Sequence, residues 1–169
     1  MFEIEILTKK GFRNSRGEHI LSDICGLGIE NVTKVEYSPL YVVNGDISFG
    51  ETEIIASELL IDKITESYVI RQCYTECCSR VISESSYVKE TDDRLNPNFS
   101  VVEVWYKNGV TDTVSESVVK AIKDLDIAKE IKVKTGHKYY LHGEILKVTL
   151  NNIVTKLLAN TLIQEYKIH

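Results

Sequence analysis

Residues 101–116, VVEVWYKNGVTDTVSE, lie over residues 3–18, EIEILTKKGFRNSRGE, when the sequence is shifted by 98 positions. The alignment continues without a gap, so that residues 3–70 match residues 101–168 with 17 identities in 68 positions. Turn glycines, helix starts and apolar faces stay in phase throughout, which indicates a repeated structural unit. We therefore divide the sequence into a first repeat, residues 1–70, a linker, residues 71–98, and a second repeat, residues 99–169.

Both repeats carry the same predicted order of elements. Short β-branched runs at residues 2–6 and 101–105 predict strands, and a glycine turn follows each of them. Ser15 and Thr113, each three residues before a glutamate, predict capping boxes that start amphipathic helices. Further elements are predicted at residues 32–43, 52–61 and 68–70 and at the aligned residues 131–141, 150–159 and 166–168. The pattern predicts an α+β fold, in which each repeat is a β-α-β-α-β unit with its helices on one face of a small sheet.

Size and charge suggest how the two repeats associate. A unit of about 70 residues is marginal alone because its core barely offsets chain entropy, so we expect the repeats to pack together with pseudo-twofold symmetry. Residues 1–70 carry 6 basic and 12 acidic side chains, a net charge of −6, whereas residues 99–169 carry 10 and 8, a net charge of +2. Either the two surfaces meet different surroundings, or their charges have drifted on solvated faces.

The composition excludes several classes of protein. At 43% hydrophobic and 27% charged residues over 169 positions, the chain is an ordinary globular protein. A net charge of −5 argues against a nucleic-acid partner, and no apolar run approaches the roughly 20 residues of a membrane helix. Residues 1–5 lack the basic start of a signal peptide, so we expect a cytoplasmic protein with no membrane partner.

The sequence also lacks the common motifs of catalysis and ligand binding. It has no glycine-rich phosphate loop, no Gly-x-Ser-x-Gly and no His-Glu-x-x-His. The cluster Cys73, Cys77 and Cys78 has no histidine nearby, and its spacing is not that of a metal site. Glu18 and Glu116, which align between the repeats, are explained by capping. We therefore predict no catalytic residue, no bound cofactor and no metal on this chain.

The second repeat resembles a known family in several turns and in its terminal segment. The carrying residues are Lys107-Asn108-Gly109-Val110, Asp112, the strand motif Val133 to Leu141, Leu157 to Asn160, and Gln164-Glu165-Tyr166. They are similar to the small S subunit of phosphoribosylformylglycinamidine synthase, the PurS family. Thr113 replaces a proline of that family, Lys134 an arginine and His137 a lysine.

The first repeat is a more distant match to the same family. Lys10-Gly11-Phe12, Tyr41 and Gly45 fit, whereas Glu36, Ser38 and Pro39 depart from the strand motif. The whole chain looks like two tandem PurS-like units, as at the amino terminus of the long single-chain synthase.

The resemblance implies a part in purine biosynthesis without chemistry of the chain's own. The family's synthase is a glutamine-dependent C–N ligase, and its S subunit bridges an ATP-using synthetase and a glutaminase. The implied partners are those two subunits, with further self-association, and ATP and Mg²⁺ would belong to the synthetase. We expect no activity of the chain alone.

We expect partner contacts around the strand motif and the turn before it. The candidate residues are Lys107, Gly109, Lys134, Gly136, His137 and Tyr139, with buried packing as the alternative role for Tyr139. Two other readings stay open at this point. One is a tandem small-molecule sensor of the ACT type, and the other is an enzyme that uses the cysteine cluster.

Overall fold

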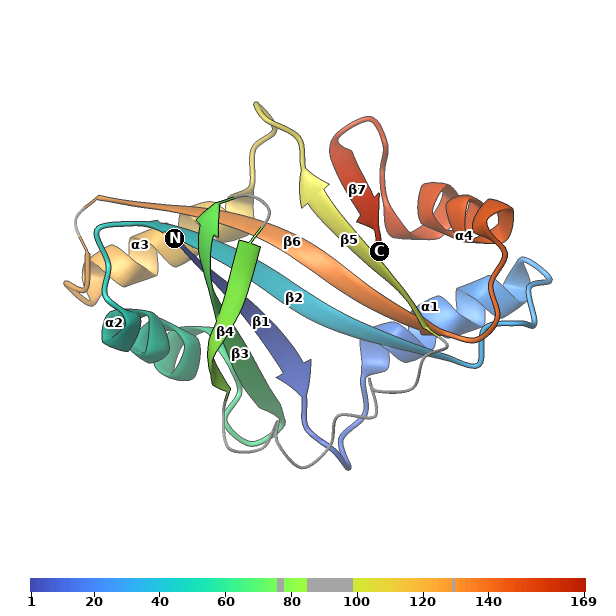
Figure 1. Ribbon diagram of the computed structural model, residues 1–169, viewed down its shortest axis with the longest axis horizontal. Coiled ribbons are helices and arrows are strands. Elements are labelled where there is room, and N and C mark those ends of the chain that lie inside the picture. The colour runs from blue at the N-terminus through green and yellow to red at the C-terminus, as the bar shows by residue number, and fades with distance from the viewer. Residues whose placement is uncertain (76–77, 85–98, 129) are drawn as a thin grey trace. The chain divides into compact units, whose positions relative to one another are not determined.

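The computed structural model describes residues 1–75, 78–84, 99–128 and 130–169 (Figure 1). These residues form two compact units, and each unit takes segments from both repeats. Unit 1 contains Met1–Phe12, Pro39–Thr91 and Thr111–Thr135. Unit 2 contains Arg13–Ser38, Asp92–Val110 and Gly136–His169. Each repeat therefore places its first helix in the unit that holds the opening strand of the other repeat.

Unit 1 is built on an antiparallel sheet in which β1 lies between β2 and β3. Its elements are β1 (Phe2–Thr8), the second half of β2 (Lys34–Gly45), α2 (Phe49–Ile54) with the π-helical η1 (Ile55–Leu60), β3 (Glu66–Thr75), β4 (Cys78–Glu84), α3 (Thr113–Asp124) and the start of β6 (Ile131–His142). In the register, Ile4 is opposite both Tyr41 and Ile70. Strand β4 pairs with the outer edge of β3.

The core of unit 1 lies between its helices and one face of this sheet. Alternate residues of β1, Ile4 and Ile6, point into it together with Ile70 of β3, as the period of two in a strand requires. Ile122 of α3 and Ile55 of η1 complete the cluster from the helix side. The apolar face of α3, which comes from the second repeat, thus covers strands of the first.

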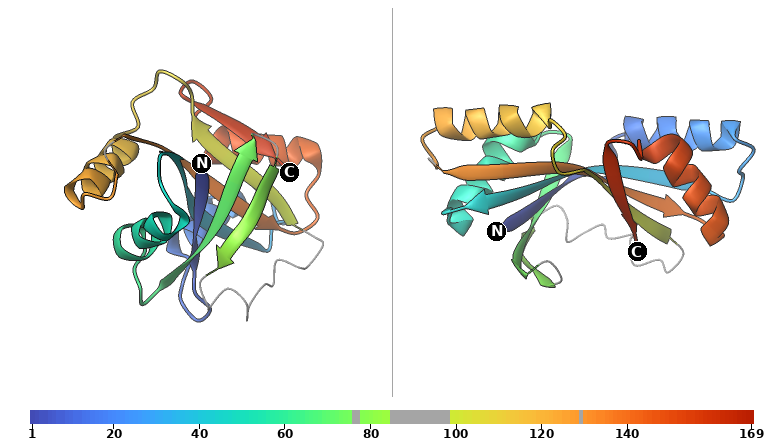
Figure 2. Two further views of the ribbon diagram at one scale, coloured as in Figure 1. Left: turned by 60° about the vertical axis from the view of Figure 1, so that its left-hand side comes forward. Right: turned by 90° about the horizontal axis from the view of Figure 1, so that it is seen from above.

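Unit 2 repeats this arrangement with the roles of the repeats exchanged. Its elements are α1 (Ser15–Gly26), the first half of β2, β5 (Phe99–Tyr106), the second part of β6, α4 (Lys147–Ile153) with the π-helical η3 (Val154–Leu158), and β7 (Gln164–Ile168). Strand β5 pairs antiparallel with β6 and with β7. Ile24 of α1 packs with Val102, Leu141 and Ile153 in one buried cluster. Both helices lie on one face of the sheet (Figure 2).

The α+β fold with helices on one face of the sheet is therefore confirmed, whereas the capping boxes predicted at Ser15 and Thr113 are wrong. The N-caps are Asn14 and Asp112, one residue earlier. Asn14 accepts a hydrogen bond from the Gly17 amide at 2.9 Å, and Asp112 accepts one from the Ser115 amide at 3.0 Å. Asn and Asp side chains carry two polar atoms, so they can bind a second segment while they cap the helix.

Both N-caps use that second atom to bind a strand. Asn14 donates from Nδ2 to the Tyr37 carbonyl at 2.8 Å. Asp112 accepts from the Thr135 amide at 3.0 Å and from its hydroxyl at 2.8 Å. A serine or threonine hydroxyl is too short to span both groups, which explains why the cap falls one residue earlier. Glu18 does not take part in capping and instead forms an ion pair with Arg13.

Two further predictions change at the ends of elements. The helix predicted at 52–61 begins at Phe49, after a true capping box in which Ser48 and Glu51 exchange hydrogen bonds. The closing strand predicted at 68–70 runs from Glu66 to Thr75, which extends it into the predicted linker, and Cys78–Glu84 of the same linker form β4. The remainder of the linker, 85–98, lies outside the described residues.

Gly143 follows β6 and lies against the chain that leads into β2. It has φ +133°, and a Cβ atom there would collide with the Asn31 carbonyl oxygen. Gly45, its aligned partner, is also crowded, because a Cβ there would lie 2.6 Å from the Glu130 carbonyl oxygen. These two glycines allow backbone segments to pass in contact.

We expect Gly143→Ala to lower the free energy of unfolding by about 1–3 kcal/mol, because it adds strain to a forbidden backbone angle. Gly50→Ala is the matched control, since Gly50 is in α2, has no positive φ and has open space around it. That control should be neutral or slightly stabilising. Urea unfolding followed by circular dichroism measures both. Equal midpoints for Gly143→Ala and the wild type would show that neither the positive φ nor the nearby Asn31 carbonyl restricts this position.

Candidate functional site

Three aromatic side chains and one arginine gather on the helix-covered face of unit 2. The Tyr37 hydroxyl is 2.9 Å from Nδ1 of His137, and the ring centroids of Tyr37 and Tyr139 are 5.6 Å apart. The guanidinium carbon of Arg16 lies 4.5 Å from the centroid of the Tyr37 ring. We call Arg16, Tyr37, His137 and Tyr139 the aromatic cluster.

The local fold explains why these residues meet. His137 and Tyr139 are two positions apart on β6, so they share one face of the strand. Tyr37 is on β2, where the side chain of Asn14 binds both its amide and its carbonyl. The same contact fixes the start of α1, which places Arg16 in the first turn over the Tyr37 ring.

Burial changes sharply across the aromatic cluster. Tyr139 is 2% exposed and belongs to the core, whereas Tyr37 and His137 are half-buried and Arg16 is exposed. Burial raises the pKa of the Tyr139 hydroxyl to about 12, and the nearby Arg16 guanidinium acts in the opposite direction. The cluster therefore offers a stacked cation, a phenol and an imidazole at the surface above an anchored tyrosine. These groups can bind a partner by hydrogen bonds and stacking.

The aromatic cluster of unit 2 has no equivalent at the aligned positions, which lie in unit 1. At the aligned positions Val114 replaces Arg16, Thr135 replaces Tyr37, and Pro39 replaces His137. Only the tyrosine is kept, as Tyr41. The two units therefore differ in the side-chain chemistry at these positions.

The other expected contact residues lie in different surroundings. Gly136 faces Trp105, whose ring atoms would lie 2.5 Å from an added Cβ. Lys107 donates from Nζ to the Thr161 carbonyl at 2.6 Å, and Gly109 has φ +88° in the turn after β5. Lys134 is on the part of β6 that belongs to unit 1. A role in partner contact stays a prediction for all six residues.

Lys107 and Gly109 have a clear structural role because the first repeat contains the same contacts. Lys9 donates from Nζ to the Lys63 carbonyl at 2.5 Å, and Gly11 also has φ +88°. Their alignment with Lys107 and Gly109 therefore reflects a shared way of closing the turn.

Sequence reasoning missed Arg16 and Tyr37. Both precede the segment in which the family resemblance lies, and they reach His137 and Tyr139 only because α1 and the start of β2 belong to unit 2.

A second missed feature is the aligned pair Glu5 and Glu103, on the sheet face opposite the helices. Glu5 is fully buried and binds Arg71 at 2.6 Å, and Glu103 binds Lys138 at 3.2 Å.

Among the residues that the structure describes, no group of three histidine, cysteine or acidic side chains is placed to hold a metal ion. Cys77 and the side chains of Cys73 and Cys78 lie outside the described residues, so the cysteine-cluster hypothesis stays a prediction. In the same described segments no helix has the length and apolar character needed to cross a membrane.

The buried hydroxyl of Tyr139 predicts a loss of stability at high pH. Its pKa rises from an ordinary value of 10.0 to about 12 in the folded chain. The neutral form is therefore favoured by folding, and the resulting stability is present below pH 10 and lost as the pH rises towards 12. We expect Tyr139→Phe to flatten the fall in the free energy of unfolding over this window. A Tyr166→Phe control should keep the fall, and an unchanged slope in Tyr139→Phe would contradict the assignment.

Comparison with known proteins finds a family match in the second repeat. Residues 100–169 match the PurS family, described as phosphoribosylformylglycinamidine (FGAM) synthase. No curated protein matches the chain. The matched segment carries β5, α3, β6, α4 and β7, and with them His137 and Tyr139. The resemblance found in the second repeat is thus confirmed, and residues 100–169, less than half of the chain, are similar to the PurS family of FGAM synthase.

Proposed function

We propose that this chain is a non-catalytic component of FGAM synthase that bridges an ATP-using synthetase subunit and a glutaminase subunit in the cytoplasm. The PurS match over residues 100–169 is the observation that carries the proposal. ATP and Mg²⁺ then belong to the synthetase, and glutamine hydrolysis belongs to the glutaminase. The chain contributes binding surfaces.

The construction of the two units supports a bridging role. Each unit holds an α+β layer with its own core, so one chain carries two related surfaces. The surfaces differ in chemistry, because the aromatic cluster occurs in unit 2 while the aligned positions in unit 1 hold Val114, Thr135 and Pro39. Two similar but unequal surfaces suit a protein that must bind two different partners.

The proposal predicts that the purified chain alone hydrolyses neither ATP nor glutamine. Added to the synthetase and glutaminase subunits, it should restore glutamine-dependent amidine formation and co-elute with them in size-exclusion chromatography. Full glutamine-dependent activity in its absence, together with no co-elution under any nucleotide condition, would end the bridging hypothesis.

A second prediction concerns Lys134 on β6. Lys134 is half-buried. Lys134→Glu should weaken the complex more at low salt than at high salt, since charge interactions near a protein surface are screened over about 8–10 Å in ordinary buffers. Lys156→Glu is the control, because it makes the same charge change on η3, which carries none of the candidate contact residues. Equal affinities for both variants at every salt concentration would remove Lys134 from the contact.

A further inference from the structure

Strand β7 is at the end of the strand order, with β5 as its neighbour among the described strands. It consists of Gln164-Glu165-Tyr166-Lys167-Ile168. Glu165 and Lys167 are exposed, Tyr166 is half-buried, and Ile168 is 39% exposed. A strand edge of this kind presents backbone groups to which another strand can bind.

The hydrogen bonds to β5 determine which backbone groups of β7 point outward. Val101 and His169 exchange both of their backbone hydrogen bonds, at 3.4 and 2.9 Å. In an antiparallel pair, such bonded residues alternate with unbonded ones. Residues 165, 167 and 169 therefore direct their amides and carbonyls to β5. Tyr166 and Ile168 direct theirs away from it, as does the Gln164 carbonyl, whereas the Gln164 amide donates to the Asn160 carbonyl at 2.7 Å.

We propose that β7 pairs antiparallel with β7 of a second copy of this chain, about a twofold axis at Tyr166. Tyr166 then exchanges two hydrogen bonds with its own copy, and the Ile168 amide of each chain donates to the Gln164 carbonyl of the other. The Gln164 amide takes no part, because it donates to the Asn160 carbonyl of its own chain at 2.7 Å. The pairing thus uses both backbone groups of Tyr166, the Ile168 amide and the Gln164 carbonyl. A twofold axis makes the contact isologous, so it closes after two chains.

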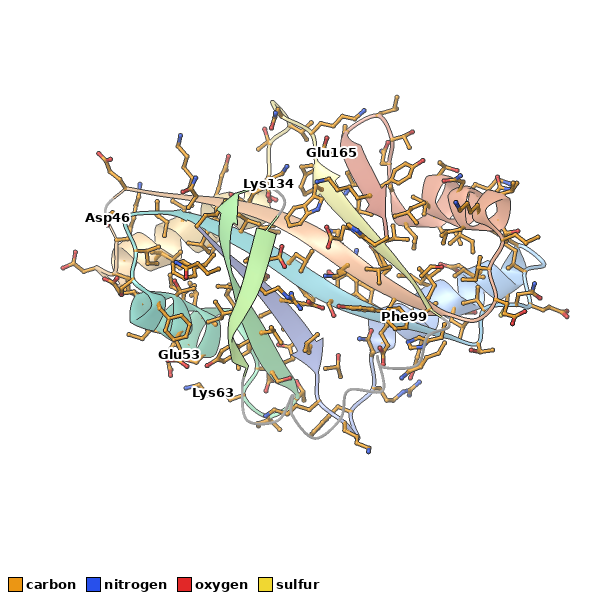
Figure 3. The ribbon with its side chains drawn as sticks, viewed as in Figure 1. Asp46, Glu53, Lys63, Phe99, Lys134 and Glu165 are labelled. Carbon is orange, nitrogen blue, oxygen red and sulfur yellow. The ribbon has the colours of Figure 1, made fainter. Side chains whose placement is uncertain are left out.

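The side chains fit this register. A twofold axis at Tyr166 places Glu165 of one copy opposite Lys167 of the other, and the pair occurs twice. Opposite charges directly across an antiparallel pair are stabilising. Lys167 has no ion pair among the described residues. Figure 3 labels Glu165 on β7. On the helix-covered face, where Tyr166 packs against the core of unit 2, the two Tyr166 rings and the exposed Ile168 side chains extend the apolar layer.

Strand β3, which aligns with β7, shows that this feature is specific. The outer edge of β3 is paired with β4 from Val69 onward. A twofold axis at Tyr68 would place Ser67 opposite Val69, with no charge pair. Of these two aligned strands, only β7 therefore has the acidic and basic residues, Glu165 and Lys167, that make its edge self-complementary.

Single charge-reversal variants of β7, tested alone and as a mixture, examine the proposed register between the two β7 strands. Sedimentation velocity of the 169-residue chain, without any partner subunit, should show a concentration-dependent dimer. Glu165→Lys places lysine opposite lysine, and Lys167→Glu places glutamate opposite glutamate, so each should raise the dimer dissociation constant at least tenfold. An equimolar mixture of the two variants should dimerise again, because both charge pairs are then complementary. The double variant Glu165→Lys/Lys167→Glu should dimerise like the wild type.

Two controls separate pairing from folding. Glu144→Lys and Lys156→Glu make the same charge changes at exposed positions outside β7 and should leave the dimer unchanged. Ile168→Pro removes one outward amide without removing a bond to β5, so it should abolish the dimer while the thermal melt is retained. A monomeric wild type, or single variants that mixing does not rescue, would overturn the proposal. Because no synthetase or glutaminase is present, these outcomes are independent of the proposed bridging role.

Discussion

Two N-cap side chains that each bind a helix and a strand determine how the rest of this chain is arranged. Asn14 ties the first turn of α1 to Tyr37, and Asp112 ties α3 to Thr135. An N-cap contributes about 0.5–2 kcal/mol to a helix. Here the second bond also fixes where the helix crosses its strand, and so where Arg16 meets the Tyr37 ring. The position of the aromatic cluster follows from this contact.

The order of elements was predictable because apolar periodicity is a local property of the sequence, and the α+β class followed from it. The exchange of helices was not, because an apolar face on α1 or α3 indicates burial without indicating which strands cover it. The N-caps were predicted one residue late, since a hydroxyl followed by glutamate matches a capping box unless the strand that needs Asn14 or Asp112 is known. For the same reason only half of the aromatic cluster was found. His137 and Tyr139 lie in a recognisable motif, whereas Arg16 and Tyr37 come from distant sequence.

Buried charge on the opposite face of the sheet adds a second constraint. Glu5 is fully buried beside Arg71, and Arg71 also binds Glu3 at 3.1 Å. Removing the cation from such a group leaves a buried carboxylate without its partner and costs far more than the pair contributes. Glu5 and Glu103 align, yet their cations come from β3 in one case and from β6 in the other. The acid is shared by the repeats, whereas each unit neutralises it from a different strand.

The tandem arrangement of the chain also determines how many copies of the aromatic cluster occur. In an assembly of two identical chains, any group of side chains made by the fold would occur twice, related by symmetry. Here both repeats are encoded in one chain, so Tyr37 and His137 can differ from Thr135 and Pro39, and the group is made once. A protein that recognises the cluster therefore meets one copy of it per chain, in one orientation. The number of cluster copies per chain and the orientation of the cluster are therefore both determined by a single polypeptide.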